Sequence, residues 1–142
     1  MSFPESFIVD ASVAAKWFVR ENLHDQALTL LDHADRLEAP DLIVSELTSI
    51  AWKKCTKGEI NLLQAQAMAA AIHHYIPTLH PASEFVEQAL EIALELNHPV
   101  YDCLYLACAK KGSLFITADE KFCNAVKGGD FESYVQYLGD ID

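Results

Sequence analysis

Two aspartates in this 142-residue sequence follow short apolar runs that are typical of buried strands. Asp10 comes directly after residues 7–9, and Asp119 comes shortly after residues 114–117. If these strands are parallel neighbours, both carboxylates lie at the carboxyl edge of one sheet, where open α/β sheets carry out their chemistry. Taken singly, each aspartate could instead cap the helix that follows it.

Two further carboxylates interrupt apolar patterns inside expected helices. Glu46 lies four residues after Leu42 and four before Ile50, a spacing that places all three on one helical face. Asp102 is the only charged residue in the run 100–109, where an unpaired buried carboxylate would be costly. Glu46 could instead be a boundary residue whose stem packs while its head reaches water. Asp102 could be a first-turn acid that the helix dipole favours.

Four acids without matching buried cations suggest a divalent cation. Mg²⁺ and Mn²⁺ prefer carboxylate oxygens, and without a cation the clustered carboxylates would repel one another. A cation held there could activate a water molecule and neutralise the charge that develops on a phosphate. The four carboxylates therefore predict phosphodiester hydrolysis, with Asp10, Glu46, Asp102 and Asp119 as metal ligands.

The rest of the chain predicts the elements that would position these residues. Apolar runs and turn signals predict strands at 6–10, 37–39, 78–80, 113–117 and 134–138. Helical spacing predicts helices at 12–19, 23–34, 42–57, 62–75, 83–96, 100–111 and 119–126, with Ser12, Asp41, Asn61 and Ser83 as N-caps. Strands that alternate with helices favour one α/β domain over residues 1–142, a parallel sheet with helices on both faces.

The expected helix 83–96 has two contrasting faces. Four glutamates at spacings of three and four residues predict a solvated acidic face; they are Glu84, Glu87, Glu91 and Glu95. The apolar positions predict a buried face; they are Phe85, Val86, Ala89, Leu90, Ala93 and Leu94. If the acidic face lined the site, non-specific affinity for nucleic acid would be poor.

The composition excludes several classes of function. A net charge of −11 argues against a general basic nucleic-acid footprint, although a metal-filled acidic site supplies its own local positive charge. The N-terminus lacks the features of a signal peptide, and no apolar stretch is suited to span a membrane. The four cysteines form no C-x-x-C pair, which predicts reduced thiols in a cytoplasmic protein. Glycine motifs for dinucleotides or nucleoside triphosphates are absent.

Four segments, in this order and at these separations, resemble one known family. They are residues 8–18, residues 39–42 with Glu46, residues 100–107 and residues 117–122. The chain resembles the PIN domains, and among them the VapC-like toxin nucleases of toxin–antitoxin pairs. The resemblance implies a PIN-like three-layer α/β/α sandwich with a five-stranded parallel sheet. It also implies a Mg²⁺- or Mn²⁺-dependent endoribonuclease with the four carboxylates as metal ligands.

The resemblance also implies supporting residues and partners. Ser12 and Thr117 could hydrogen-bond a metal-bound water or a ligand carboxylate, as their counterparts do in similar proteins, and Lys16 could reach a phosphate. Family members cut RNA to leave a 3′-hydroxyl and a 5′-phosphate, often form homodimers, and are silenced by an antitoxin protein. Trp17, Phe18 and Trp52 could anchor a helix of that antitoxin, or could pack in the core.

Two other classes of function remain as alternatives. One is a catalytically silent PIN-like module that binds a protein partner through the same aromatic residues. The other is a receiver-like domain, in which Asp10 or a neighbour accepts a phosphoryl group and Thr117 assists. Receiver domains need a lysine after the last strand, and none follows residues 135–138.

Overall fold

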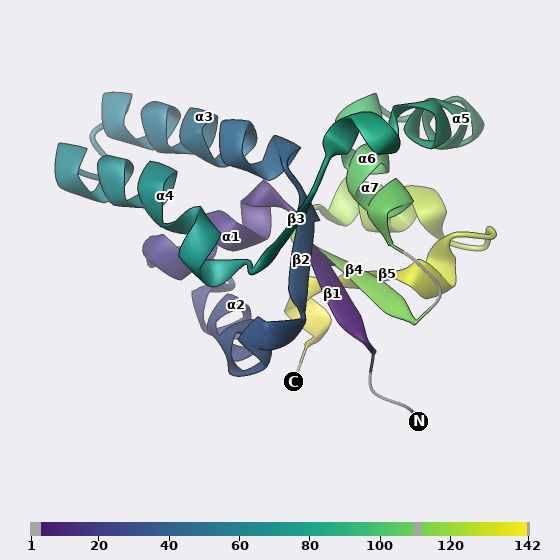
Figure 1. The fold of residues 1–142 in the computed structure, drawn as a ribbon, viewed down its shortest axis with the longest axis horizontal. Helices are drawn as coiled ribbons and strands as arrows, with labels where there is room; N and C mark the ends of the chain where they lie inside the picture. The colour runs from purple at the N-terminus through teal and green to yellow at the C-terminus, as the bar shows by residue number, and fades with distance from the viewer. Residues whose placement is uncertain (1–3, 110–111, 142) are drawn as a thin grey trace.

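Five parallel strands form the middle layer of a three-layer α/β/α sandwich (Figure 1). The computed structural model describes residues 4–109 and 112–141, and its strands are β1 (Ser6–Val9), β2 (Leu37–Pro40), β3 (Thr78–His80), β4 (Ser113–Thr117) and β5 (Val135–Tyr137). They are arranged in the order β3-β2-β1-β4-β5, with every neighbouring pair parallel. The structure confirms the α/β class and the five parallel strands.

The central strand β1 is buried along its whole length. Strands covered on both faces are made of continuous apolar residues, so the run 7–9 could be recognised in the sequence. In the register with β4, Ile8 pairs with Phe115 and Val9 with Ile116. One residue further along, Asp10 and Thr117 therefore face each other at the carboxyl edge.

The order of the strands creates a crevice at that edge. From β1 the chain builds outward through β2 to β3, then crosses to the other side of β1 to form β4 and β5. Such a reversal separates the connections that follow β1 and β4, and ligands of open α/β sheets bind beside it. Asp10 follows β1 and Asp119 follows β4, so both stand at the reversal.

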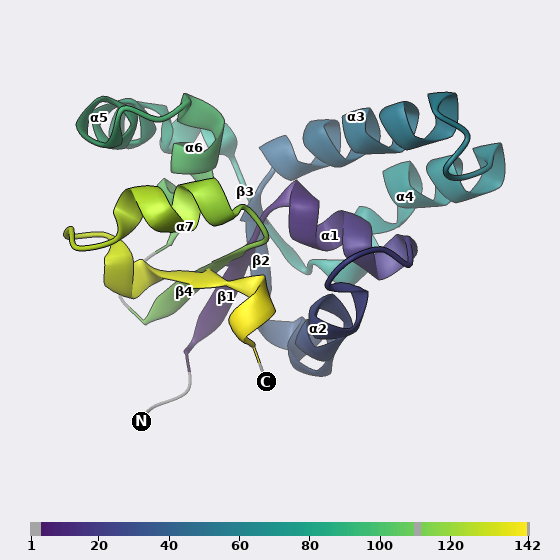
Figure 2. The same ribbon diagram turned by 180° about the vertical axis from the view of Figure 1, so that it is seen from behind.

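Helices cover both sides of the sheet, as Figure 1 and the reverse view in Figure 2 show. One side carries α1 (Ala11–Phe18), α2 (His24–Thr29), α3 (Leu42–Thr56) and α4 (Leu62–Tyr75), of which α3 and α4 lie side by side. The other side carries α5 (Val86–Leu96), α6 (Val100–Cys108) and α7 (Glu120–Val126). Short 3-10 helices lie between these elements at Leu30–Arg36, Ala82–Glu84 and Glu132–Tyr134, and another, Leu138–Asp140, follows β5.

Several element boundaries differ from those expected. The expected helix 23–34 is split, because α2 ends at Thr29 and the 3-10 helix that follows has a kink at His33. The expected helix 100–111 ends at Cys108, and residues 110 and 111 lie outside the described residues. Helical spacing of apolar residues persists through a 3-10 segment, so the pattern alone did not reveal the split.

Three of the four expected N-cap side chains do not cap a helix. Asp10, in extended conformation, caps α1 in place of Ser12. Asp41 already has helical dihedral angles, and its Oδ1 accepts from the backbone N–H of Ala82 at 2.9 Å instead. Ser83 lies in a 3-10 turn before α5, which has no side-chain cap. Asn61 does cap α4, in a reciprocal capping box with Gln64.

The predicted burial of α5 is half right. The four glutamates of its acidic face are all exposed, as expected. Ala89 is buried and Ala93 partly so, but Val86, Leu90 and Leu94 are exposed, and the face turned to the core includes Ile92. Small residues let α5 approach α6 closely, so the contact with α6 uses a narrower stripe than the apolar pattern covers.

No helix among the described residues is long and apolar enough to cross a bilayer.

Candidate metal centre

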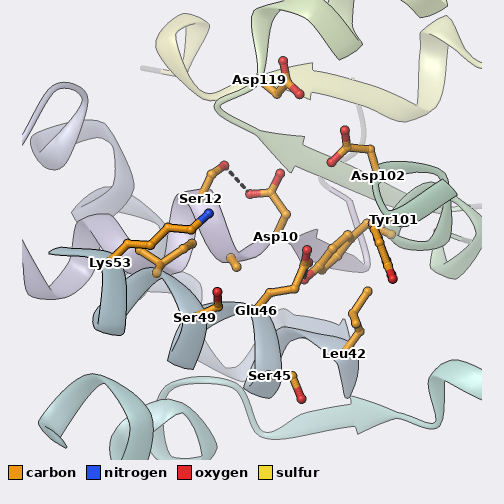
Figure 3. A pocket seen from close by; sticks show the side chains of 13 residues that line it. Asp10, Ser12, Leu42, Ser45, Glu46, Ser49, Lys53, Tyr101, Asp102 and Asp119 are labelled. Atoms are coloured by element: carbon orange, nitrogen blue, oxygen red, sulfur yellow. Dashed lines mark hydrogen bonds between the residues drawn. The ribbon is translucent and has the colours of Figure 1, made fainter. Parts of the chain in front are cut away.

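A cavity of about 410 Å³ opens at the carboxyl edge of the sheet, and all four predicted carboxylates line it. Figure 3 shows the side chains of Asp10, Glu46, Asp102 and Asp119 turned toward this space. They come from four places in the chain: the ends of β1 and β4, the helix α3 and the first turn of α6. The fold therefore brings together residues that are more than a hundred positions apart in the sequence.

Asp10 is the most buried of the four, with 5% of its surface exposed. Its Oδ1 accepts hydrogen bonds from the Ser12 hydroxyl at 2.6 Å and from the Val13 backbone N–H at 3.0 Å. Its Oδ2 accepts from the Thr117 hydroxyl at 2.5 Å. A carboxylate has about four acceptor sites, so three donors leave one lone pair on Oδ2 for a ligand.

Burial dominates the electrostatics of Asp10. Desolvation raises its pKa from the usual 3.8 to about 6, although the donors Ser12, Thr117 and Val13 each lower it. Asp102 adds a smaller upward contribution through charge repulsion. A carboxylate held so firmly yet so unfavourably charged is stabilised when a cation binds beside it.

Glu46 reaches the cavity because α3 turns one of its faces toward it. Residues at spacings of three and four along this face line the cavity; they are Leu42, Ser45, Glu46, Ser49, Ile50 and Lys53. The opposite, buried face carries Ile43, Leu47 and Ala51. Glu46 Oε1 accepts from the Tyr105 hydroxyl at 2.6 Å, and burial raises the pKa of Glu46.

Asp102 and Asp119 lie close together across the boundary between α6 and α7. Burial is the main cause of the raised pKa of Asp102, and the neighbouring charge of Asp119 raises it further. Asp102 Oδ2 is 2.7 Å from His98 Nε2, which favours its ionised form. Asp119 caps α7 through Oδ1, which accepts from the backbone N–H groups of Lys121 and Phe122. One ligand atom each of His98, Asp102 and Asp119 lie within 4.8 Å of one another.

These donor sets fit a hard divalent cation. Among the described residues, the donors His98, Tyr105 and the α7 backbone engage one oxygen each of Asp102, Glu46 and Asp119, and the Asp102 and Asp119 carboxyl groups also contact each other. The second oxygen of each, with the remaining lone pair of Asp10, can therefore serve as a ligand. Oxygen donors with room for water molecules are what Mg²⁺ and Mn²⁺ require. The expected caps of Asp10 and Asp119 are real, but capping uses only part of each carboxylate.

Comparison with known proteins identifies the family. The model of the PIN domain family matches residues 7–128. The chain belongs to the PIN domain family. The protein is also 30% identical, over 117 residues, to Ribonuclease VapC3 of Pyrobaculum aerophilum, which spans 80% of this chain and 89% of that relative.

Solved structures confirm the fold. The PIN domain described here superposes on the crystal structure of PAE2754 from Pyrobaculum aerophilum with a TM-score of 0.68 at 20% identity, over 94% of this chain and 84% of the other. It superposes on Mycobacterium tuberculosis VapC20, a toxin that cleaves the sarcin–ricin loop, with a TM-score of 0.61 at 22% identity. That match spans 90% of this chain and 94% of VapC20. At these identities the likeness concerns the fold.

The three supporting residues of this PIN domain differ in their positions. Ser12 and Thr117 both donate to the Asp10 carboxylate, which is one of the two roles expected of them. Lys16 is buried in α1, where its Nζ is 3.2 Å from Glu21 Oε2, and Lys54 pairs with the other oxygen of Glu21. Lys16 therefore has a partner in the described structure and is not among the residues that line the cavity.

Three further residues shape the site, and sequence reasoning missed two of them, Tyr105 and His98. Lys53 is the one basic residue among the described residues that line the cavity, and Figure 3 shows its side chain extending over it. The sequence shows Lys53 in a basic cluster with Lys54 and Lys57, and its spacing of seven residues from Glu46 places it on the cavity side of α3. Tyr105 is buried and holds Glu46, and it lies three residues after Asp102 on α6. His98 precedes α6, and its link to Asp102 follows a spacing of four.

Proposed function

We propose that this protein is a metal-dependent endoribonuclease, the toxin of a type II toxin–antitoxin pair, which hydrolyses RNA phosphodiester bonds in the cavity. The observation that carries the proposal is the convergence of Asp10, Glu46, Asp102 and Asp119 on one open cavity. Among the described residues that line this cavity, Lys53 is the one basic residue. Membership of the PIN family and the resemblance to a ribonuclease support it. The cofactor proposed is Mg²⁺ or Mn²⁺, held by those four side chains.

The residues of the site would divide the work between holding the cation and holding the substrate. A bound Mg²⁺ or Mn²⁺ would supply a Lewis acid that neutralises phosphate charge and lowers the pKa of a bound water. Asp10 is fixed by three donors, and Glu46 by Tyr105, so the ligand oxygens are held before substrate arrives. The Lys53 ammonium would attract a backbone phosphate to the open side of the cavity.

The acidic net charge does not block access to this cavity. The exposed glutamates of α5 are not among the described residues that line it. The acidic face therefore points elsewhere, and the conflict between the charge of −11 and RNA binding weakens. RNA would approach along the α3 side, where Lys53 is exposed.

The proposed partners are an antitoxin protein and a second copy of the chain. Of the three aromatic residues considered, Trp17 is buried, and its indole N–H donates to the Ala27 carbonyl at 2.9 Å. Phe18 packs edge-on against Tyr75, whereas Trp52 is 64% exposed. Trp52 therefore remains the candidate anchor for the antitoxin. The exposed residues Val86, Leu90 and Leu94 of α5 form one apolar surface that we propose for a homodimer. The buried thiols of Cys103 and Cys108 accord with the cytoplasm.

The decisive experiment compares RNA cleavage by the protein with that by Asp102→Asn. Total cytosolic RNA is incubated with purified protein and Mn²⁺, Mg²⁺ or a chelator, and the new ends are sequenced. We expect cation-dependent cuts with 5′-phosphate and 3′-hydroxyl ends, which Asp102→Asn abolishes without loss of folded structure by circular dichroism. Asp130→Asn is the matched control, because Asp130 is exposed and does not line the cavity, and it should cut normally.

Two results would contradict the proposal. Undiminished cleavage by Asp102→Asn would remove the role given to Asp102. No cleavage by protein that mass spectrometry shows to be free of any bound partner would favour the catalytically silent binding module.

A further inference from the structure

His98 is anchored in the short connection between α5 and α6, next to the proposed metal centre. Asn97 ends α5 in a left-handed conformation (φ 50°), and the His98 backbone N–H donates to the Ala93 carbonyl at 3.1 Å. This bond, from the second residue past a helix end back to its last turn, is a common C-terminal capping arrangement. Pro99 then restricts the chain just before α6. The backbone of His98 is therefore fixed independently of its side chain.

The His98 imidazole contacts Asp102 on one side. Its Nε2 lies 2.7 Å from Asp102 Oδ2, and since an ionised carboxylate only accepts, the imidazole donates this hydrogen bond. The two side chains are 14% and 32% exposed, so the pair is shielded from water but not sealed from it. This hydrogen bond engages Oδ2 and does not use Oδ1 of Asp102.

On its other side, the His98 ring contacts the helix that carries Asp119. It packs edge-to-face on Phe122, with ring centroids 5.0 Å apart and an interplanar angle of 71°. Phe122 is fully buried in α7, and its backbone N–H donates to Asp119 Oδ1. The imidazole is therefore held between the Asp102 carboxylate and the first turn of α7. Through these contacts the imidazole helps to fix the Asp102 carboxylate of α6 relative to the Asp119 carboxylate at the start of α7.

His98 is not one of the described residues that line the cavity. It would touch neither RNA nor the reacting phosphate, so an effect on the reaction must pass through Asp102. Groups that hydrogen-bond a metal ligand on the side away from the metal orient that ligand and change its affinity for the metal. Without such a group, a carboxylate on a helix rotates among several orientations. Cation binding must then restrict this rotation, and the entropy cost weakens the binding.

We propose that His98 is a positioning residue that holds the Asp102 carboxylate in the orientation needed for a divalent cation, and so sets the cation affinity of the site. This inference rests on the proposed metal-dependent function. It assigns no ligand bond to His98 itself.

The test measures Mn²⁺ binding to the full-length, metal-free protein by calorimetry, without RNA. His98→Leu removes the donor but keeps an apolar side chain against Phe122, and it should weaken Mn²⁺ binding by about tenfold to a hundredfold. His98→Gln, whose amide nitrogen reaches a similar position to Nε2, should restore affinity close to that of the parent. Thermal unfolding without metal shows whether each variant is folded, and rescue by glutamine separates positioning from packing.

The chain offers a matched control in a second histidine–carboxylate pair. His80 Nε2 lies 2.6 Å from Glu38 Oε1, with side chains 22% and 29% exposed, and neither residue lines the cavity. His80→Leu should therefore leave Mn²⁺ affinity unchanged. If His98→Leu does not fold, His98→Asn replaces it, because its shorter amide cannot reach Asp102 and should weaken binding in the same way.

Three outcomes would overturn the inference. The first is unchanged Mn²⁺ affinity in a folded His98→Leu or His98→Asn, and the second is lost affinity in a folded His98→Gln. The third is a ¹⁴N signal from imidazole in the electron spin-echo spectrum of bound Mn²⁺, which would make His98 a ligand. Asp102→Asn separates this failure from that of the proposed function. If Asp102→Asn also binds Mn²⁺ like the parent, the metal centre itself is wrong. If Asp102→Asn loses binding while His98→Leu keeps it, only the positioning role is wrong.

Discussion

The Thr117 hydroxyl donates a 2.5 Å hydrogen bond to Asp10 Oδ2, which joins the carboxyl ends of β4 and β1. The same Thr117 oxygen accepts from the Asp119 backbone N–H at 3.1 Å. One side chain thus fixes the most buried carboxylate and the start of the turn that carries another. The two strands are held in register at the point where the proposed cation would bind.

Replacing Thr117 with valine should disturb Asp10 more than the fold. The variant keeps the shape of the side chain but removes one of three donors, and hydrogen bonds to charged groups are worth about 1.5–3 kcal/mol. We expect the pKa of Asp10 to rise above about 6, so that Mn²⁺ binding requires a higher pH. Calorimetry across a pH series measures the shift, and Thr117→Ser should reverse it. An unshifted pH midpoint would show that the hydroxyl does not control Asp10.

The metal-free protein should lose stability as the pH rises from about 4 to about 6. Burial raises the pKa of Asp10 from 3.8 to about 6, so in this range the folded protein binds more protons than the unfolded chain. The free energy of unfolding therefore falls with pH through this window and levels off above it. Two pKa units correspond to roughly 3 kcal/mol for this residue. The raised pKa values of Glu46 and Asp102 act in the same direction.

Asp10→Asn provides the matched comparison for that pH dependence. Asparagine is also a good N-cap and can donate to Thr117, but it does not ionise. Urea unfolding without metal should show a flatter pH profile for this variant, with higher stability than the parent at pH 7, while RNA cleavage is lost. A parent profile that rises between pH 4 and pH 6 would contradict the assignment.

Tyr105→Phe should weaken cation binding through Glu46. The Tyr105 ring is buried and stacks on Phe115 with centroids 5.9 Å apart, so phenylalanine keeps the packing. The loss of the hydroxyl donor leaves Glu46 less fixed and harder to ionise, since that hydrogen bond lowers its pKa. We expect a stability change of about 1 kcal/mol and a clear loss of Mn²⁺ affinity. Equal affinity in both proteins would limit Tyr105 to a packing role.

Lys53→Gln should impair RNA binding without affecting cation binding. If Lys53 contacts one backbone phosphate, its removal should lower RNA affinity and reduce the slope of log affinity against log salt by about one. The measurement uses Asp102→Asn as a non-cleaving background at several salt concentrations. Lys57→Gln is the control, because Lys57 is also exposed near the end of α3 but does not line the cavity. An identical salt slope in both variants would place the phosphate elsewhere.

Several features of this protein could be read from the sequence because their causes are local. The buried strand before Asp10 shows as an apolar run, and Asp102 is conspicuous as a lone charge among apolar residues. Glu46 breaks a helical stripe of regular spacing. The capping box of Asn61 with Gln64 involves residues three positions apart, so both partners are visible together.

Other features depended on contacts between distant segments. Ser12 was expected to cap α1, but the cap is Asp10, whose carboxylate is also held by Thr117 from another strand. Leu94 was expected in the core and is 74% exposed, because the side of α5 that faces the core carries Ala89 and Ile92 instead. Helical spacing identifies an apolar stripe but not which part of it finds a partner.

The sequence by itself thus determined which carboxylates meet at the cavity, because charge in apolar surroundings is a property of neighbouring residues. Only the tertiary structure decided how those side chains are held. The donors to Asp10, Glu46 and Asp102 include Thr117 and Tyr105, which come from other elements, and His98, which also packs on Phe122 of α7. The crossing of the chain from β3 to β4 sets these distances. A one-dimensional pattern contains no information on which strands become neighbours, so the supporting residues emerged with the fold.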